Sequence, residues 1–344
     1  MSAASSFAAR PLAGRMAPGL WLGALAAALC AVSFWSLAIG AAGLSPADLA
    51  TALFADEGSR AGAVALTVRL PRLLAGLLAG SALAVAGAIM QAVTANPLAS
   101  PGLLGVNAGA AFAVVVSTML VAGAGTGFYI WWAFAGAGIA AALVYGVGGA
   151  GRSGATPLKL ALAGAILSAF IGSLTAAILI FDKGTLDAVR IWTVGSVEGR
   201  TLGAVGAVAP YIGAGLVGAL VFRGQVTVLS LGEDIARQVG QNVALWRLVS
   251  ALLVVLLAGG AVAIAGPIGF VGLVVPHIAR MLVGADYRRV IPASALGGAL
   301  LVVTADAALR AALPARDIPV GVGMALIGAP FFIWLARNRI GGGA

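Results

Sequence analysis

Long apolar segments recur along the whole chain, and they constrain its fold more than any other feature. Most are long enough to cross about 30 Å of hydrocarbon as a helix. Charged residues occupy only 9% of the 344 positions, too few for the surface of a soluble domain. The sequence therefore predicts an all-α, polytopic transmembrane helical bundle, built as a single domain over residues 1–344. Ten spans are expected, approximately at residues 20–42, 70–91, 103–123, 128–148, 160–181, 204–222, 248–266, 268–283, 291–310 and 319–336.

The basic residues between these segments predict the orientation of the bundle. An even number of spans places both termini on one side of the membrane. If that side is the cytoplasm, twelve of the twenty basic residues are cytoplasmic and eight are external. Cytoplasmic segments carry an excess of Lys and Arg, so both termini are expected inside, with residues 1–19 as a cytoplasmic tail. The first apolar segment is too long for a secretory signal and is expected to remain as the first span.

Several function classes are disfavoured by the residues that are scarce. His277 is the only histidine and Cys30 the only cysteine, so neither a multi-histidine nor a thiolate metal site is expected. Lys159 and Lys183, the two lysines, both lack the Gly-Lys-Ser/Thr context of a phosphate-binding P-loop. The basic residues form no cluster that favours nucleic acid, and no catalytic constellation is evident. The chain is thus expected to be no enzyme, to bind no cofactor and to contact membrane lipid.

Residues 224–247 form a predicted cytoplasmic segment that contains a short amphipathic helix. Ser230 and Glu233 have the spacing of a capping box, and Gly240 is typical of a helix C-terminus. A nine-residue helix is marginal alone in water, so it is expected to rest on the bilayer or to dock on a partner. Its apolar face is predicted to comprise Leu231, Ile235 and Val239, and its polar face Glu233, Asp234, Arg237 and Gln238.

Helix-breaking residues occur at membrane depth. Non-helical backbone is tolerated there only where it is buried in protein or lines a cavity. These residues therefore predict a packed core around a pathway, although prolines at span ends also occur in simple turns. They are Asn96, Pro97, Pro101 and Gly105 between the second and third spans, and Gly266, Pro267, Gly269, Pro276 and His277 around the seventh and eighth.

Ionisable residues near the predicted external surface have two interpretations each. Asp306 is the only carboxylate placed within a span; it can serve in proton coupling, but charge compensation by Arg310 at i+4 is the simpler interpretation and is expected. Arg69 and Arg72 are expected at the external mouth of the second span. They can anchor to lipid phosphates, or they can pair with carboxylates, for which the planar guanidinium is well suited. External residues 43–68 and 182–203 are each expected to contain a short helix.

Ordered segments from about residue 60 to 337 resemble the FecCD-type permeases. These segments are RLPR, AGAIMQAVTANPLASPGLLGVNAGA, LSLGEDIARQVG, GPIGFVGLVVPHIAR and IPVGVGMALIGAPFFIW. The resemblance implies a permease subunit of an ATP-binding-cassette importer in the bacterial inner (plasma) membrane. It also implies a pathway shared with a second permease copy or a paralogue, two ATPase subunits inside, and a periplasmic substrate-binding protein outside.

Individual residues acquire roles through this resemblance. Arg69, Arg72 and Arg310 match external arginines that pair with acidic residues of the binding protein. The segment TLDAVRIWTVGSVEGR is most similar to ferric-siderophore permeases, so an iron(III)–siderophore complex is the expected substrate, with haem or cobalamin as alternatives. An autonomous ion-coupled carrier is the alternative of another class, but it should show ionisable residues facing its pathway. The expected ATPase-coupling residues are Leu231, Gly232, Glu233, Asp234, Ile235, Arg237, Val239 and Gly240.

Overall fold

The computed structural model describes residues 17–40, 60–121, 126–150, 156–313 and 317–340. These residues form helices joined by short links, with no strand among them, so the all-α prediction is confirmed. Seven helical segments are long and apolar enough to cross a membrane, and three shorter apolar helices cover residues 106–120, 271–283 and 320–331. Together these ten segments fall where the ten spans were predicted.

The helices have the following bounds. In the first half of the described chain they are α1 (Pro18–Ala38), α3 (Arg60–Val64), α4 (Leu70–Val93), α5 (Val106–Leu120), α6 (Thr126–Gly148) and α7 (Pro157–Phe181). In the second half they are α8 (Lys183–Val194), α9 (Leu202–Val221), α10 (Arg223–Ser230), α11 (Glu233–Gln238), α12 (Val243–Val254), α13 (Gly260–Ala265), α14 (Val271–Val283), α15 (Tyr287–Ala312) and α16 (Val320–Ile340).

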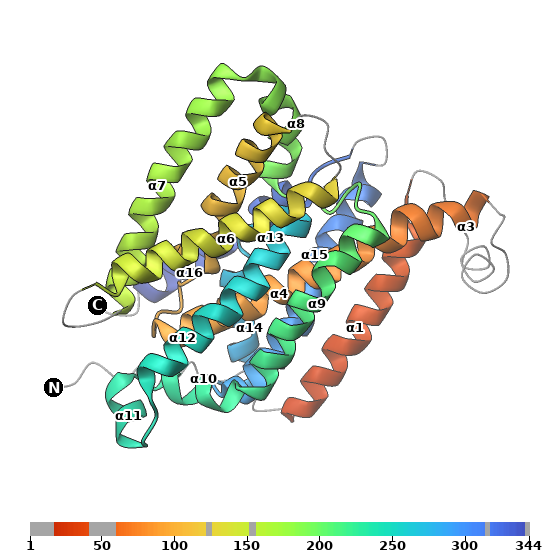
Figure 1. Ribbon diagram of the computed structural model, residues 1–344. Coiled ribbons are helices and arrows are strands. Elements are labelled where there is room, and N and C mark those ends of the chain that lie inside the picture. Colours follow the sequence, from red (N-terminus) through yellow and green to blue (C-terminus); the bar gives the residue numbers. More distant parts are fainter. Residues whose placement is uncertain (1–16, 41–59, 122–125, 151–155, 314–316, 341–344) are drawn as a thin grey trace.

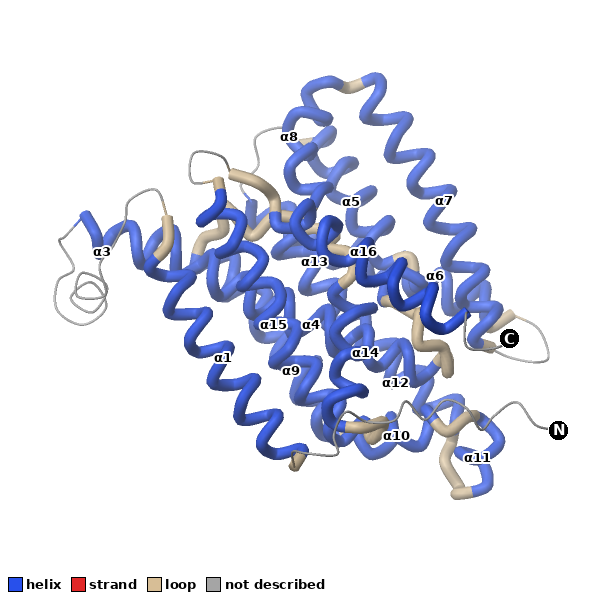
Figure 2. Tube along the Cα trace, turned by 180° about the vertical axis from the view of Figure 1, so that it is seen from behind, coloured by secondary structure: helices blue, strands red, loops and turns tan. Residues whose placement is uncertain are grey.

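Helix α4 runs through the middle of the bundle, and α1 and α7 lie at opposite edges (Figures 1 and 2). The span that contains α4 is 83% buried, whereas those of α1 and α7 are only 6% and 11% buried. Glycines permit this central packing. A Cβ atom on Gly80 of α4 would collide with the backbone of Gly298 on α15, and one on Gly87 with the backbone of Gly272 on α14. Close approach through small residues is the expected packing in lipid, where hydrophobic burial does not drive helix association.

The two ends of the bundle differ in the elements that they carry. Helix α8 lies at one end, across the tips of α5 and α7, and α10 and α11 lie at the opposite end (Figure 1). Helix α8 begins after Asp182, whose carboxylate accepts a hydrogen bond from the Thr185 N–H, and it confirms the short helix expected within residues 182–203. Most of residues 43–68, including the other expected short helix, lie outside the described residues.

The second span differs from its prediction. It was expected to begin near residue 70, but helix extends back to Arg60 through a π-helical turn at Ala65–Arg69. Pro71 has no N–H to donate to a preceding carbonyl, and the widened turn directly before it absorbs that interruption. Arg69 and Arg72 therefore lie within a continuous helix rather than at its lip.

The predicted capping box is wrong. Helix α11 comprises six residues, not nine, and it starts after Gly232, whose φ of 101° ends the preceding turn and supplies no side-chain cap. The Ser230 hydroxyl instead donates to the Thr227 carbonyl within α10. The predicted stop is confirmed, because Gly240 follows the helix with a φ of 80°.

The non-helical segments lie where helix breakers predicted them. After α4, a turn and a short 3₁₀ helix (Pro101–Leu104) lead to Gly105, whose φ of 71° begins α5. Between α13 and α14, Gly266 and Phe270 have φ values of 71° and 67° and bracket extended backbone.

Candidate functional sites at the two ends of the bundle

A buried ion pair joins α4 to α15 at the α8 end. Arg72 Nη2 lies 2.9 Å from Asp306 Oδ1, and Arg72 Nε lies 3.0 Å from the same oxygen. Both side chains are enclosed, with exposed fractions of 10% and 6%. The i+4 partner predicted for Asp306 is also present, because Arg310 Nε lies 3.0 Å from Asp306 Oδ2. One carboxylate therefore holds two guanidinium groups.

The remaining donors of these arginines cap the end of α1. Arg310 Nη1 donates to the carbonyls of Ser36 and Ile39, and its Nη2 donates to the Ser36 hydroxyl at 2.7 Å. Arg69 Nη1 donates to the carbonyls of Leu37 and Ala38. These carbonyls belong to the C-terminal turn of α1, which has no intrahelical donors for them. Arg69, Arg72 and Arg310 are thus brought together, as expected, but with their guanidinium groups facing inward.

Two further carboxylates approach this arginine cluster from the outer side. Asp317 Oδ1 lies 3.7 Å from Arg72 Nη1, and the Asp317 side chain is 67% exposed. Glu198, in the link between α8 and α9, lies beside Asp317. Burial raises the pKa of Glu198, and the neighbouring Asp317 carboxylate raises it further. The α8 end therefore presents acidic groups outermost, with the basic groups beneath them.

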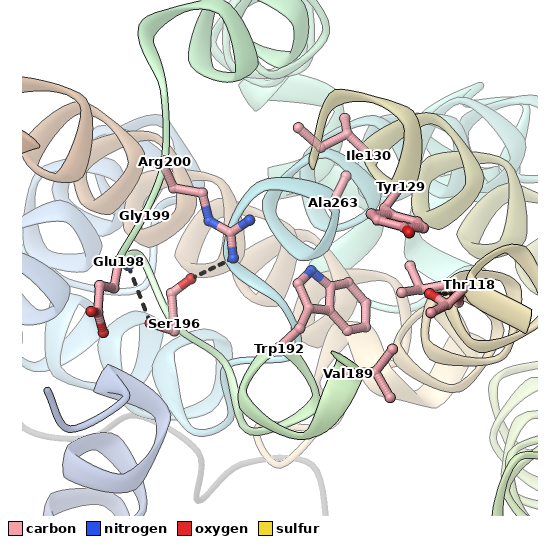
Figure 3. A pocket seen from close by; sticks show the side chains of 11 residues that line it. Thr118, Tyr129, Ile130, Val189, Trp192, Ser196, Glu198, Gly199, Arg200 and Ala263 are labelled. Atoms are coloured by element: carbon pink, nitrogen blue, oxygen red, sulfur yellow. Dashed lines mark hydrogen bonds between the residues drawn. The ribbon is translucent and has the colours of Figure 1, made fainter. Parts of the chain in front are cut away.

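A cavity of about 340 Å³ lies beside this cluster, under α8. The rings of Trp192 and Tyr129 line it, and the Arg200 guanidinium extends toward it (Figure 3). Arg200 Nη2 donates to the Ser196 carbonyl at 3.1 Å, and burial lowers the pKa of Arg200. Trp192 is thus part of a cavity wall as well as of the short helix α8.

Helix α11 exposes apolar residues at the opposite end. Leu231, Ile235 and Val239 have exposed fractions of 56%, 46% and 64%, whereas Ala236, on the other side of the helix, is fully buried. Glu233, predicted on the polar face, is one third exposed, and its carboxylate pairs with Arg237 and, at 2.9 Å, with Arg247 of α12. The pair with Arg247 holds α11 against α12, while Leu231, Ile235 and Val239 remain exposed.

Gln91 links the two non-helical segments and had no role in the sequence prediction. Its Nε2 lies 3.3 Å from the Ala99 carbonyl and 3.2 Å from that of Gly272. Asn96 sits in the turn itself, where its Oδ1 accepts a hydrogen bond from the Leu98 N–H. His277 is buried within α14, with its ring 6.4 Å from that of Phe331. No group of three or more metal-ligating side chains occurs in the part of the chain that the structure describes.

Comparison with known proteins decides the family. The model of the FecCD transport family matches residues 28–338. The chain belongs to the FecCD transport family. Two Bacillus subtilis relatives cover most of its length: the siderophore transport system permease protein YfiZ, 44% identical over 91% of this chain and 93% of its own, and the Fe(3+)-citrate import system permease protein YfmD, 45% identical over 88% and 90%. A solved metal-chelate type ABC transporter in an inward-facing conformation is 28% identical, with a TM-score of 0.82 over 93% of this chain and 99% of its own.

FecCD membership agrees with the sequence motifs that predicted it. The motifs did not predict the polar and charged side chains that surround the arginine cluster and the non-helical segments. Glu198 and Asp317 lie in links without hydrophobic periodicity. Gln91 and Arg280 fall in segments where the predicted non-helical backbone rested on prolines and glycines. Arg72 was expected at the external mouth of its span, available to lipid or to a binding protein. Its partner in the structure, Asp306, is 234 positions away in the sequence, and no local pattern indicates that pairing. The sequence contained one indication of a partner for Asp306, since a carboxylate inside the membrane needs a nearby cation. Arg310 at i+4 already met that need, so a second arginine was not expected.

Proposed function

We propose that this FecCD protein is the membrane-spanning permease subunit of an ATP-driven importer for an iron(III)–siderophore complex. The observation that carries the proposal is the exposed apolar side of α11. Three large exposed apolar residues, one on α11 and two flanking it, form a surface suited to another protein, and the Glu233–Arg247 pair holds this segment to α12. Because the permease of an ATP-driven importer has no P-loop of its own, we assign this surface to a separate ATPase subunit.

The orientation follows from the positive-inside rule and places the α11 end in the cytoplasm. The ATPase then docks on residues 231–240, and a periplasmic binding protein approaches the α8 end, where the arginine cluster of Arg69, Arg72 and Arg310 lies. Helices α7 and α16 expose large apolar residues, including Ile166, Phe170 and Leu326, and a second permease copy or a paralogue covers this face. Localisation in a bacterial inner membrane follows from the same assembly.

The substrate class rests on the relatives. Those described above are named for siderophore transport and for Fe(3+)-citrate import. The chain is 61% apolar and holds 50 glycines, so it offers mainly small and apolar residues for the pathway that it shares with a second permease. Such walls transmit a large chelate without holding it, and selection of the chelate is left to the binding protein.

Iron-55 uptake tests the proposal in a strain that lacks this gene and is complemented with it. The panel comprises several ferric siderophores and ferric citrate, with haem and cobalamin uptake measured in parallel. Uptake of a ferric siderophore that depends on the gene and stops on ATP depletion is expected. Uptake that survives ATP depletion, without a co-purifying ATPase, would instead identify an autonomous carrier.

A further inference from the structure

A second cavity, of about 570 Å³, lies at the α11 end. Its volume falls within the range of about 300–1,000 Å³ that is usual for ligand pockets. Three parts of the chain form its walls: the end of α4 with the following turn, the end of α10, and the junction between α14 and α15. The polar residues among them are Gln91, Thr227, Ser230, Arg280, Asp286 and Tyr287, and Leu231 lies at the boundary.

Arg280, in the last turn of α14, carries a positive charge into this cavity. Its Nη1 and Nη2 atoms are both buried, and neither has a hydrogen-bond partner among the described residues. The neutral Tyr287 phenol interacts with the Arg280 side chain through a hydrogen bond, but the ion pairs of the described chain include none to Arg280. A buried charge without a counter-charge is strongly unfavourable, so the site is complementary to an anion.

The Asp286 carboxylate lines the same cavity but forms no ion pair with Arg280 in the part of the chain that the structure describes. The Asp286 carboxylate is held by its neighbours, since its Oδ1 accepts from the Thr227 hydroxyl at 3.1 Å and from the Arg288 N–H at 2.9 Å. The Ser230 hydroxyl donates to the Thr227 carbonyl at 2.7 Å. Gln91 Oε1 is buried without a partner and is an acceptor, so a ligand near it must offer a donor or water.

The geometry of a guanidinium selects the form of the anion. Two terminal N–H groups side by side match the two oxygens of a carboxylate in a bidentate pair. The source of the carboxylate follows from the position of the cavity. Leu231 contributes both to the cavity wall and to the exposed apolar surface with Ile235 and Val239. A protein seated on that surface therefore lies directly at the cavity.

We propose that the cavity around Arg280 is a socket for an aspartate or glutamate side chain of the ATPase subunit. The apolar surface of residues 231–239 supplies contact area, and the socket supplies one desolvated ion pair that fixes the register of docking. This inference rests on the proposed function, because it requires that an ATPase docks at this end.

The test measures the affinity of the purified ATPase for the immobilised, detergent-solubilised permease. Arg280→Gln removes the charge and is expected to raise the dissociation constant by about tenfold or more, as truncation of a desolvated ion pair does. Arg280→Lys keeps the charge without the planar fork and is expected to give an intermediate value. The affinity of the wild type is also expected to fall more steeply with salt than that of Arg280→Gln. Double-mutant cycles between Arg280→Gln and alanine variants of each acidic residue on the docking face of the ATPase then identify the partner carboxylate.

Arg289→Gln is the matched control, because it removes the same charge from an exposed side chain near the start of α15. It is expected to leave the affinity unchanged. Thermal unfolding of the permease alone separates docking from folding: Arg280→Gln is expected to unfold at the same temperature or higher, because an uncompensated buried charge is removed. A lower unfolding temperature that accounts for the weaker binding would overturn the socket.

Two further outcomes would also overturn it. One is an Arg280→Gln variant that binds the ATPase as tightly as the wild type does. The other is stabilisation of the wild-type permease, but not of Arg280→Gln, by millimolar inorganic phosphate while ATPase affinity is the same for both, which would identify a site for a free anion. If the wild type binds no ATPase at all, the proposed function itself fails, and this result is distinct from either outcome.

Discussion

Arg72 on α4 and Asp306 on α15 form a buried ion pair at the α8 end of the bundle, in which Arg72 Nη2 and Nε both lie near Asp306 Oδ1, at 2.9 and 3.0 Å. Arg310 occupies the other carboxylate oxygen. A single buried carboxylate thus fixes two arginines, and through Arg310 it also fixes the C-terminal turn of α1. The first expectation from this arrangement is structural.

Asp306→Asn should destabilise the permease strongly. It leaves Arg310 without its carboxylate partner and Arg72 with only the exposed Asp317 at 3.7 Å, and breaking a buried pair in this way typically costs about 3–5 kcal/mol. Thermal unfolding in detergent measures the loss. Asp317→Asn is the control, because its side chain is 67% exposed and the same substitution there should change stability by less than about 0.5 kcal/mol. Equal unfolding temperatures for the two variants would show that the ion pairs of Asp306 with Arg72 and Arg310 do not stabilise the fold.

Asp317→Asn should instead strengthen docking of the binding protein, if the arginine cluster receives acidic residues. Asp317 lies 3.7 Å from Arg72 Nη1 and competes for the group that an incoming carboxylate needs. An exposed pair is worth about 0.2–1 kcal/mol, so affinity should rise by up to about fivefold at low salt. Binding to the permease in nanodiscs measures it. Unchanged affinity would leave Arg72 outside the docking contact.

This variant is a cleaner test of docking than charge reversal. Arg69→Glu with Arg72→Glu is still expected to weaken docking and uptake in a salt-sensitive way. However, it also places new carboxylates beside Asp306 and removes donors from the end of α1, so folding and docking are lost together. Basal ATPase activity of the complex should survive only where the double variant still folds.

Ile235→Asp should abolish ATPase-dependent uptake without preventing membrane insertion. Ile235 is 46% exposed in the permease alone, so the substitution is tolerated until an ATPase covers it and buries an unpaired carboxylate. Uptake and ATPase co-purification are measured at matched expression. Gln238→Asp adds the same charge to the polar side of α11 and should have a smaller effect. Normal uptake by Ile235→Asp would remove this surface from the docking interface.

Glu198→Gln should stabilise the permease at neutral pH and not at low pH. Burial raises the pKa of Glu198 above its ordinary value of 4.5, so the folded state favours the protonated form. Its contribution to stability is therefore full below about pH 4.5 and is lost as pH rises through the folded pKa. Unfolding temperatures of variant and wild type should converge near pH 4.5 and separate above it. The difference should shrink but persist in an Asp317→Asn background, because burial is the larger cause; a pH-independent difference would contradict it.

Gly80→Ala should impair folding, whereas Gly206→Ala should not. A methyl group at Gly80 meets the Gly298 backbone, and overpacking of this kind typically costs about 1–3 kcal/mol. Gly206 lies on an exposed side of α9 with no atom within 4 Å of an added Cβ, and alanine favours helix there. Yield of monodisperse protein and its unfolding temperature report both effects, and equal behaviour would contradict the close crossing.

The sequence predicted those features that depend on local pattern. Apolar length located the spans, glycine and proline located the breaks before Gly105 and after Ala265, and the spacing of Ile235 and Val239 predicted an apolar helix face. The predictions failed where partners are distant in the sequence. Glu233 was expected to cap its own helix, but Arg247 takes its carboxylate, and Arg72 was expected to face outward although Asp306 draws it in. Such pairings follow from the tertiary crossing of helices and not from any local period.

The backbone contacts of α4 with α14 and α15 also limit how this protein can move. Where glycine faces backbone, as Gly87 does with Gly272, no layer of side chains exists that could repack into a second arrangement. We therefore expect these three helices, with the C-terminal turn of α1 that Arg310 holds to α15, to shift as one block, and alternating access to involve displacement of loosely buried helices such as α7. The centre of the bundle serves as the fixed frame of the transport cycle, and the periphery carries its motion.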